Sequence, residues 1–189
     1  MSLKTVWQNP LRLSLIPTDD PMSFLRMPAG HTGLPLGPKH PGSFGFVRKH
    51  HIHEGVDLYT AEGEAVYAAE DGAIVAIEAF TGPKAGYPHW LDTDAILVKG
   101  PSGVIVYGEL VPHSTIKTGL EIKAGQLLGN VTRVLRHDKG RPTIMLHLEL
   151  HDAHVTKTFE WAVNGQKPAS LRDPTPYLVP LSKPYLNIP

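Results

Sequence analysis

Short β-type runs separated by turn residues fill the middle of the chain, and this pattern constrains its fold more than any other feature. The clearest runs lie at 56–59, 65–69, 73–77, 95–98 and 104–107, with glycine, proline or aspartate at the turns between them. The region 119–133 continues the pattern, and 143–151 reads as a further strand. Many short strands between turn signals predict an all-β sandwich or barrel. Only the stretch 159–163 fits a short helix or turn.

The two ends of the chain are rich in proline and glycine, which break helices and remove donors from strand ladders. Residues 1–50 and 168–189 both show this composition. We therefore expect an irregular N-terminal arm at 1–41, which wraps the core or covers a sheet edge. A single antiparallel β domain follows at 42–180, and a C-terminal tail at 181–189 lies along its surface.

Composition excludes several functional classes. Lys+Arg and Asp+Glu both count 18, whereas a nucleic-acid binder normally carries a basic excess. No stretch of 18 apolar residues is present, so we expect no membrane span. The first fifteen residues lack the cationic start and continuous apolar run of a secretory signal. If this N-terminus is the native one, we expect a cytoplasmic protein.

The chain has no cysteine and eleven histidines. Disulfides and thiolate metal sites are therefore excluded, and any bound metal must be held by nitrogen and oxygen ligands. A His/carboxylate site is the pattern to search for.

His53 and Asp57 are a first candidate pair of ligands. In a straight strand they would lie about 13 Å apart, at about 3.3 Å per residue, whereas donors to one zinc lie about 2.0–2.2 Å from it. The chain must therefore bend between them, and Gly55 can adopt backbone angles that other residues resist. The alternative is an exposed loop histidine beside an aspartate that caps a strand.

A second candidate lies in the strand at 143–151. By strand alternation His147, Glu149 and His151 share one face with residue 145, while the leucines at 146, 148 and 150 point to the core. The alternative is an ordinary polar strand face in contact with solvent.

Together the motifs resemble the lysostaphin-type zinc peptidases. The stretch 53–57 resembles their His-x-Gly-x-Asp block, and 146–149 resembles the end of their His-x-His-x-Glu strand. The glycine-containing stretches 63–72 and 122–129 and the closing Asp-Pro-x-x-Tyr-Leu at 173–178 also match in order. The resemblance covers roughly 43–178 and implies a barrel-sandwich hybrid fold of antiparallel strands.

The resemblance also implies a site and a ligand class. Zinc would be held by His53, Asp57 and His147, with a fourth position open to water. Glu149 and His151 would orient His147 from behind, unless they are merely solvated. The expected partner is a peptide or a peptidoglycan-like ligand.

Two positions depart from the family pattern. Active members carry a histidine at each of them, where this chain has Met145 and Glu109. A thioether is only a weak acceptor, so we expect one catalytic contribution to be lost at Met145. Glu109 could act as a general base, as glutamate does in other zinc peptidases, or could simply fill a degenerate position.

Three functions follow as hypotheses. The first is a zinc-binding, peptidase-like domain with little or no activity, a pseudoenzyme. The second is an active zinc metalloendopeptidase with Glu109 as base. The third is a biotinyl- or lipoyl-type carrier, which ranks last because Lys139 lies outside the turn where such a lysine is expected.

Two further expectations concern the surroundings of the site. The proline- and glycine-rich arm could cover the groove, since it directly precedes the metal motif. Among the other histidines, His50, His51, His113 and His137 are expected at the surface or rim, with His51 and His137 nearest to the motifs in sequence.

Overall fold

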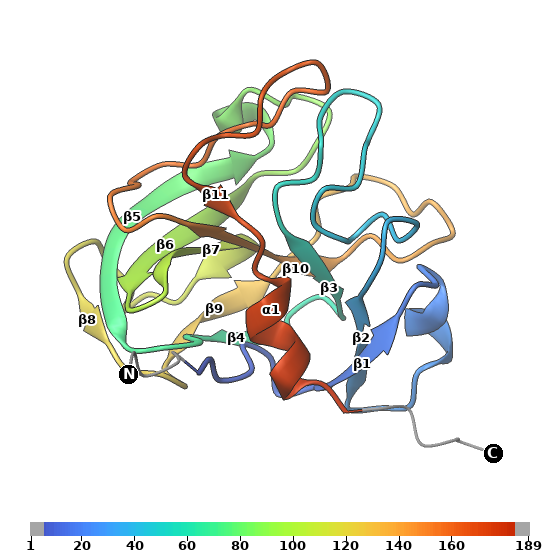
Figure 1. Cartoon of the computed structure of the whole chain (residues 1–189), viewed down its shortest axis with the longest axis horizontal. Helices are drawn as coiled ribbons and strands as arrows, with labels where there is room; N and C mark the ends of the chain where they lie inside the picture. The colour runs from blue at the N-terminus through green and yellow to red at the C-terminus, as the bar shows by residue number, and fades with distance from the viewer. Residues whose placement is uncertain (1–5, 184–189) are drawn as a thin grey trace.

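The computed structural model describes residues 6–183 and consists mostly of antiparallel β-strands (Figure 1). Its elements are β1 (Ser14–Thr18), η1 (Ser23–Arg26), β2 (His31–Pro35), β3 (Val56–Tyr59), β4 (Ala65–Tyr67), β5 (Gly72–Thr81), η2 (Pro83–Ala85), β6 (Thr93–Gly100), β7 (Gly103–Pro112), β8 (Glu121–Ile122), β9 (Leu127–Val131), β10 (Met145–His151), β11 (Leu171–Arg172), α1 (Thr175–Leu178) and η3 (Val179–Leu181). The predicted all-β class is confirmed.

One large sheet runs in the order β11-β10-β7-β6-β5-β8, with every described pair antiparallel. Strand β10 has β7 along one edge, and β3 and β11 in succession along the other. Strand β9 joins β7 to β4. Asp57 lies on β3 and His147 on β10, whereas His53 lies just before β3.

The central strands bury both of their faces. Ile105 and Tyr107 of β7 point into the main core, while Val104 and Val106 point into a second, smaller apolar cluster on the opposite face. Strand β6 divides its side chains in the same way. This double burial explains why 95–98 and 104–107 read as continuous apolar runs rather than as strict alternation.

The N-terminal arm is more ordered than its proline and glycine content predicts. Strands β1 and β2 pair in parallel with each other (Figure 1). Trp7, Leu11, Leu15 and Leu34 are buried in the same core as the large sheet. The arm therefore packs as part of the hydrophobic core instead of lying loosely over it.

The C-terminal segment likewise contributes to the core. Leu171 and Leu178 are fully buried, and Tyr177 stacks on Trp7 with ring centroids 4.8 Å apart. The end of the domain predicted at 42–180 therefore packs into the core. Most of the tail assigned to 181–189 lies outside the described residues.

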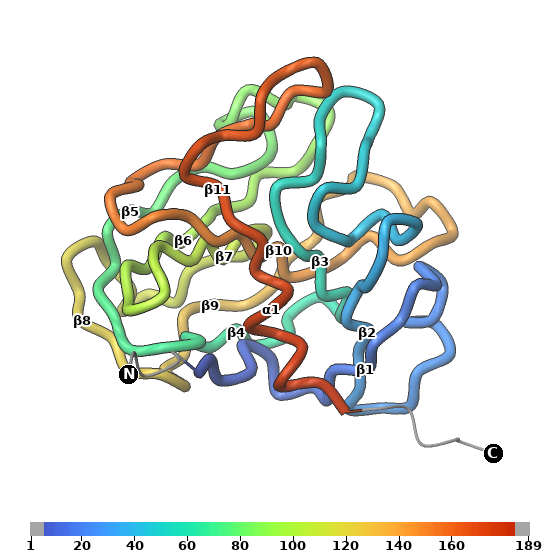
Figure 2. The backbone as a smooth tube through the Cα atoms, viewed as in Figure 1, coloured from blue at the N-terminus to red at the C-terminus, as the bar shows by residue number. Residues whose placement is uncertain are grey.

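Long loops gather at one end of the large sheet, drawn at the top of Figure 2. The loop before β3 contacts the segment after β10, because Ile52 donates to the carbonyl of Trp161 and His51 forms a β-bridge with Ala162. Residues 159–163 form no helix: 159–161 are irregular, Ala162 lies in the bridge and a turn begins only at Val163.

Candidate metal centre

The register of β3 against β10 places His147 directly opposite Asp57. His53 approaches the same point from the irregular segment that leads into β3. A Cβ on Gly55 would overlap the carbonyl oxygen of Leu148 and lie 2.9 Å from Cε1 of His147. The predicted bend at Gly55 is present, but the glycine is required by the close approach of β10 and not by a left-handed backbone angle.

Three donor atoms converge at this point. His53 Nε2 lies 3.0 Å from Asp57 Oδ1 and 3.2 Å from His147 Nδ1, and the third side of the triangle measures 2.8 Å. Donors around one tetrahedral zinc lie about 3.4 Å apart, given bonds of about 2.0–2.2 Å. The three side chains therefore form a group that could hold a metal ion after a small outward movement.

The outer ring nitrogen of each histidine has a hydrogen-bond partner. His53 Nδ1 lies 2.9 Å from the carbonyl oxygen of Ser43, and His147 Nε2 lies 3.0 Å from Glu149 Oε1. Both partners only accept, so each imidazole donates outward. The two inner nitrogens can then turn their lone pairs toward Asp57, and three acceptors at these distances are held together by a proton or by a metal cation.

Asp57 is held from its other side by Arg48, whose Nη2 lies 2.7 Å from Oδ2. Burial would raise the pKa of Asp57, but His53 and Arg48 hold it well below its usual range. The carboxylate therefore stays ionised and offers one oxygen to the centre.

A buried polar chain continues behind His147. Glu149 Oε2 accepts from His151 Nε2 at 2.8 Å, and His151 Nδ1 lies 3.3 Å from Ser170 Oγ. Burial disfavours a charge on His147, but hydrogen bonds to Asp57 and Glu149 raise its pKa to about 10. The polar face of β10 is thus fully covered, so the solvated alternative is excluded for all three residues.

Glu109 lies at a β-bulge of β7. Ile96 pairs with Tyr107 and Asp94 pairs with Leu110, so Gly108 and Glu109 together oppose Ala95. Among the described residues Glu109 is the only one other than glycine with a positive φ, at 63°. Bulges and such strained angles recur beside functional sites, where they redirect a side chain.

The surroundings of Glu109 connect it to the metal group. Burial and the nearby Asp57 raise the pKa of Glu109 to about 8, with His147 and Arg48 opposing. Its Oε2 is buried and has no hydrogen-bond partner among the described residues. Within the described residues this oxygen therefore has no partner, whether Glu109 is protonated or ionised.

A family comparison agrees with this geometry. The model of peptidase family M23 matches residues 51–159, which include the three converging side chains and Glu109. The chain belongs to peptidase family M23. A comparison with curated proteins gave no match.

Several solved structures also resemble the chain. Lysostaphin of Staphylococcus simulans is 20% identical with a TM-score of 0.50, over 74% of this chain and 48% of its own. Its catalytic domain is 24% identical with a TM-score of 0.44, over 68% and 80%. A zinc-containing peptidase of Vibrio cholerae is 19% identical with a TM-score of 0.40, over 62% and 31%. The chain spans about half the length of lysostaphin.

The pseudoenzyme hypothesis finds no support in this M23 domain, because its His/Asp/His metal group is complete. The carrier hypothesis is likewise not favoured by the family match.

Met145 begins β10 on the His147 face, opposite Tyr59. No helix among residues 6–183 is long and apolar enough to cross a membrane.

Sequence reasoning missed the supporting loop at 40–48. Ser43 and Arg48 both contact the metal group, and the carbonyl of Gly42 accepts from the amide of Asp57. The end of the arm region therefore lies beside the site, as the groove-covering hypothesis requires, but it supports the ligands from behind. Irregular chain carries no periodicity, so only the position of the loop just before the motif could have indicated this role.

Proposed function

We propose that this M23 domain is an active zinc peptidase whose metal is held by His53, Asp57 and His147. The convergence of three acceptor atoms within 3.2 Å of one another, each fixed from behind, is the observation that carries the proposal. Two histidines and one carboxylate suit zinc and leave a coordination position open.

Bound zinc would polarise the peptide carbonyl and lower the pKa of water, which makes water a nucleophile at neutral pH. The chain's own contribution is to hold its ligands in place. The carbonyl of Ser43 and the carboxylate of Glu149 fix the ring orientation of the two histidines, as outer hydrogen bonds do in other metal sites.

Glu109 is the proposed general base. Its unpartnered Oε2 would accept a proton from the attacking water and later pass it to the leaving amine. Burial, and then repulsion from Asp57, disfavour its ionised form in the absence of a cation. A cation at the metal group would offset that charge, so the carboxylate would ionise more readily.

Met145 lowers the expected rate. Its thioether cannot donate a hydrogen bond to the negative oxygen of a tetrahedral intermediate, and the loss of one such donor typically costs about 10²–10³ in rate. We therefore expect a slow peptidase. The proposed substrate is a peptide of the peptidoglycan class, which rests on the family alone.

The test is hydrolysis of a panel of oligoglycine peptides and peptidoglycan fragments by the zinc-loaded chain. We expect turnover by the native chain and a decrease of about 10²–10⁴ with Glu109→Gln. Glu121→Gln, at an exposed position of β8, is the matched control and should leave turnover unchanged.

Two outcomes would count against the proposal. If the zinc-loaded native chain hydrolyses nothing in the panel, the result supports the hypothesis of an inactive zinc-binding domain instead. If Glu109→Gln turns over at the native rate, the site catalyses without this base.

A further inference from the structure

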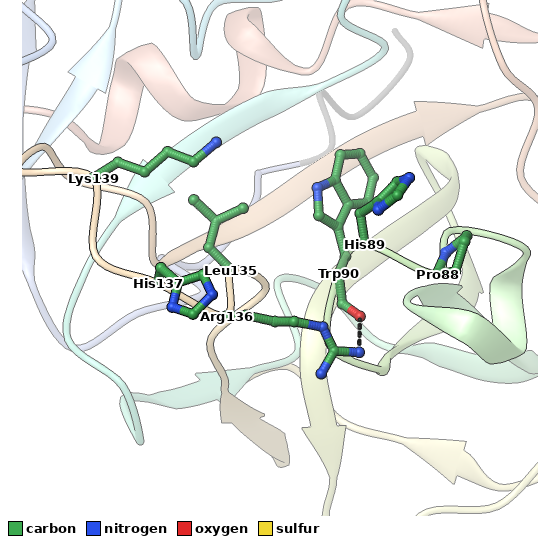
Figure 3. A pocket seen from close by; sticks show the side chains of 7 residues that line it. All are labelled: Pro88, His89, Trp90, Leu135, Arg136, His137 and Lys139. Atoms are coloured by element: carbon green, nitrogen blue, oxygen red, sulfur yellow. Dashed lines mark hydrogen bonds between the residues drawn. The ribbon is translucent and has the colours of Figure 1, made fainter.

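A groove of about 410 Å³ lies between the residues preceding β6 and the loop that leads from β9 to β10 (Figure 3). Pro88, His89 and Trp90 form one wall, and the other consists of Leu135, Arg136, His137 and Lys139. The amide of Leu91 donates to the carbonyl of Val134, and Arg136 Nη2 donates to the carbonyl of Trp90 at 3.2 Å. The two walls are therefore bonded to each other.

The charged side chains that line this groove are all basic, although the chain as a whole has zero net charge. Arg136 and Lys139 line it together with His89 and His137, and no carboxylate is among the lining residues. The one acid of the loop, Asp138, accepts from the amide of Gly140 and lines the adjoining groove rather than this one. The ion pairs of the described residues involve other lysines and arginines.

The groove continues toward the metal centre. Leu135 and His137 also line a second groove of about 530 Å³, which reaches Thr60 and Ile144. The amide of Thr60 donates to the carbonyl of Ile144. These two residues directly follow β3 and directly precede β10, the strands that carry Asp57 and His147.

We propose that the groove of 88–90 and 135–139 binds a side-chain or terminal carboxylate of the peptide substrate, away from the bond that is cut. This inference rests on the proposed peptidase function. Arg136 uses one of its donors on Trp90, so further guanidinium N–H groups remain for an acceptor. The surfaces of Trp90, Leu135 and Pro88 suit the apolar parts of a peptide better than a bare phosphate.

The experiment compares two isosteric peptides, acetyl-Gly-Gly-Gly-Gly-Glu-amide and the same peptide ending in Gln. Binding is measured by calorimetry to the full zinc-loaded chain carrying Glu109→Gln, and mass spectrometry establishes whether the peptides stay intact. We expect the Glu peptide to bind about fivefold more tightly, the size of one exposed charge pair. Lys139→Glu should abolish this preference.

Lys117→Glu is the matched control, because Lys117 lies in an exposed turn outside the groove and the charge change is the same. Its preference for the Glu peptide should equal that of the parent chain. Equal affinity for both peptides, or an equal loss with Lys117→Glu, would overturn the proposal. So would glycerol phosphate binding that depends on Lys139 while the two peptides bind alike, since the site would then serve phosphate.

The readout is separate from catalysis. A carboxylate preference that depends on Lys139 supports the groove even if the native chain hydrolyses nothing. Hydrolysis without such a preference would uphold the peptidase and reject the groove.

Discussion

His147 lies directly opposite Asp57 in the antiparallel ladder of β10 and β3, and its Nδ1 is 2.8 Å from Asp57 Oδ1. Side chains opposite each other in such a pair start with Cβ atoms about 4.5–5.5 Å apart. Strand register alone therefore brings two of the three donors together. A shift by one residue would turn His147 into the core and replace it with a leucine.

Replacing His147 by alanine should remove the metal and destabilise the fold. We expect zinc content to fall from about one ion per chain to about a tenth, because a three-donor zinc site loses one donor. Asp57 and Glu149 would remain buried without their common partner, at a cost of about 3–5 kcal/mol. Elemental analysis and denaturant unfolding measure the two effects.

The control for this substitution is His113→Ala, at an exposed histidine whose side chain hydrogen-bonds only to Thr115 in its own turn. It should leave zinc content and unfolding free energy close to native. Native zinc content in His147→Ala would refute the assignment of the ligand.

The strands and the metal group were predictable from sequence for different reasons. Alternation and turn residues are local signals, so β3, β5, β6, β7 and β10 were found with boundaries within a few residues. His53, Asp57 and His147 were separate candidates from spacing and alternation, and only the order of the family's motifs joined them into one site. Their spacing alone also fitted an exposed loop histidine and a solvated strand face, since no local rule brings residues 53 and 147 together.

Other features depend on contacts that the sequence does not encode locally. Glu149 and His151 read equally well as a solvated strand face, and they are buried because Ser170 and Phe159 return over β10. The parallel pairing of β1 and β2 and the bulge at Glu109 are likewise fixed by tertiary packing. Glutamate rarely adopts a positive φ, so nothing in the sequence indicates the left-handed backbone at Glu109.

Glu109→Gly should stabilise the chain while abolishing the proposed catalysis. Glycine adopts φ near 63° without strain, and the change also removes a buried carboxylate oxygen that lacks a partner. We expect a gain of about 1 kcal/mol in the free energy of unfolding. Glu109→Gln keeps the backbone strain and should show no such gain, so urea unfolding of both variants separates strain from charge. A less stable Glu109→Gly chain would contradict this account.

Gly55→Ala should disrupt the metal centre through its backbone. The added Cβ would overlap the carbonyl oxygen of Leu148 and crowd the ring of His147. We expect a loss of about 3 kcal/mol in the free energy of unfolding and weaker zinc binding. Gly165→Ala meets only Ala162 at 3.3 Å, and it should stay within about 1 kcal/mol of native. Equal effects of the two substitutions would show that close approach does not require Gly55.

Glu149→Gln should weaken zinc binding without removing it. The amide oxygen still accepts from His147, but the negative charge that strengthens the imidazole as a ligand is lost. Such changes behind a ligand typically cost about 10–100-fold in metal affinity. Competition with a chelator measures the change. Glu70→Gln alters another buried carboxyl, which binds Ser102 outside the metal group, and should leave zinc affinity unchanged. Native affinity in Glu149→Gln would mean that Glu149 serves the fold alone.

The metal-free chain should lose stability as pH rises above about 6.5. Burial opposes the charge on His147, yet Asp57 and Glu149 raise its pKa from 6.5 to about 10. The folded chain therefore binds a proton that the unfolded chain releases in this window, and stability falls with pH. Glu109 acts in the same direction, because its folded pKa of about 8 exceeds its ordinary value of 4.5.

Zinc should reverse this slope, because it takes the place of the proton between the ligands and binds only the neutral imidazole. Melting temperatures recorded with and without zinc from pH 6.5 to about pH 8.5 should therefore diverge as pH rises. On the acid side, burial opposes ionisation of Glu149, but its histidine partners lower its pKa from 4.5 to about 2. Both forms should thus lose stability as pH falls through that range. A metal-free melting temperature that does not change between pH 6.5 and about pH 8.5 would show that no proton replaces the cation at His147.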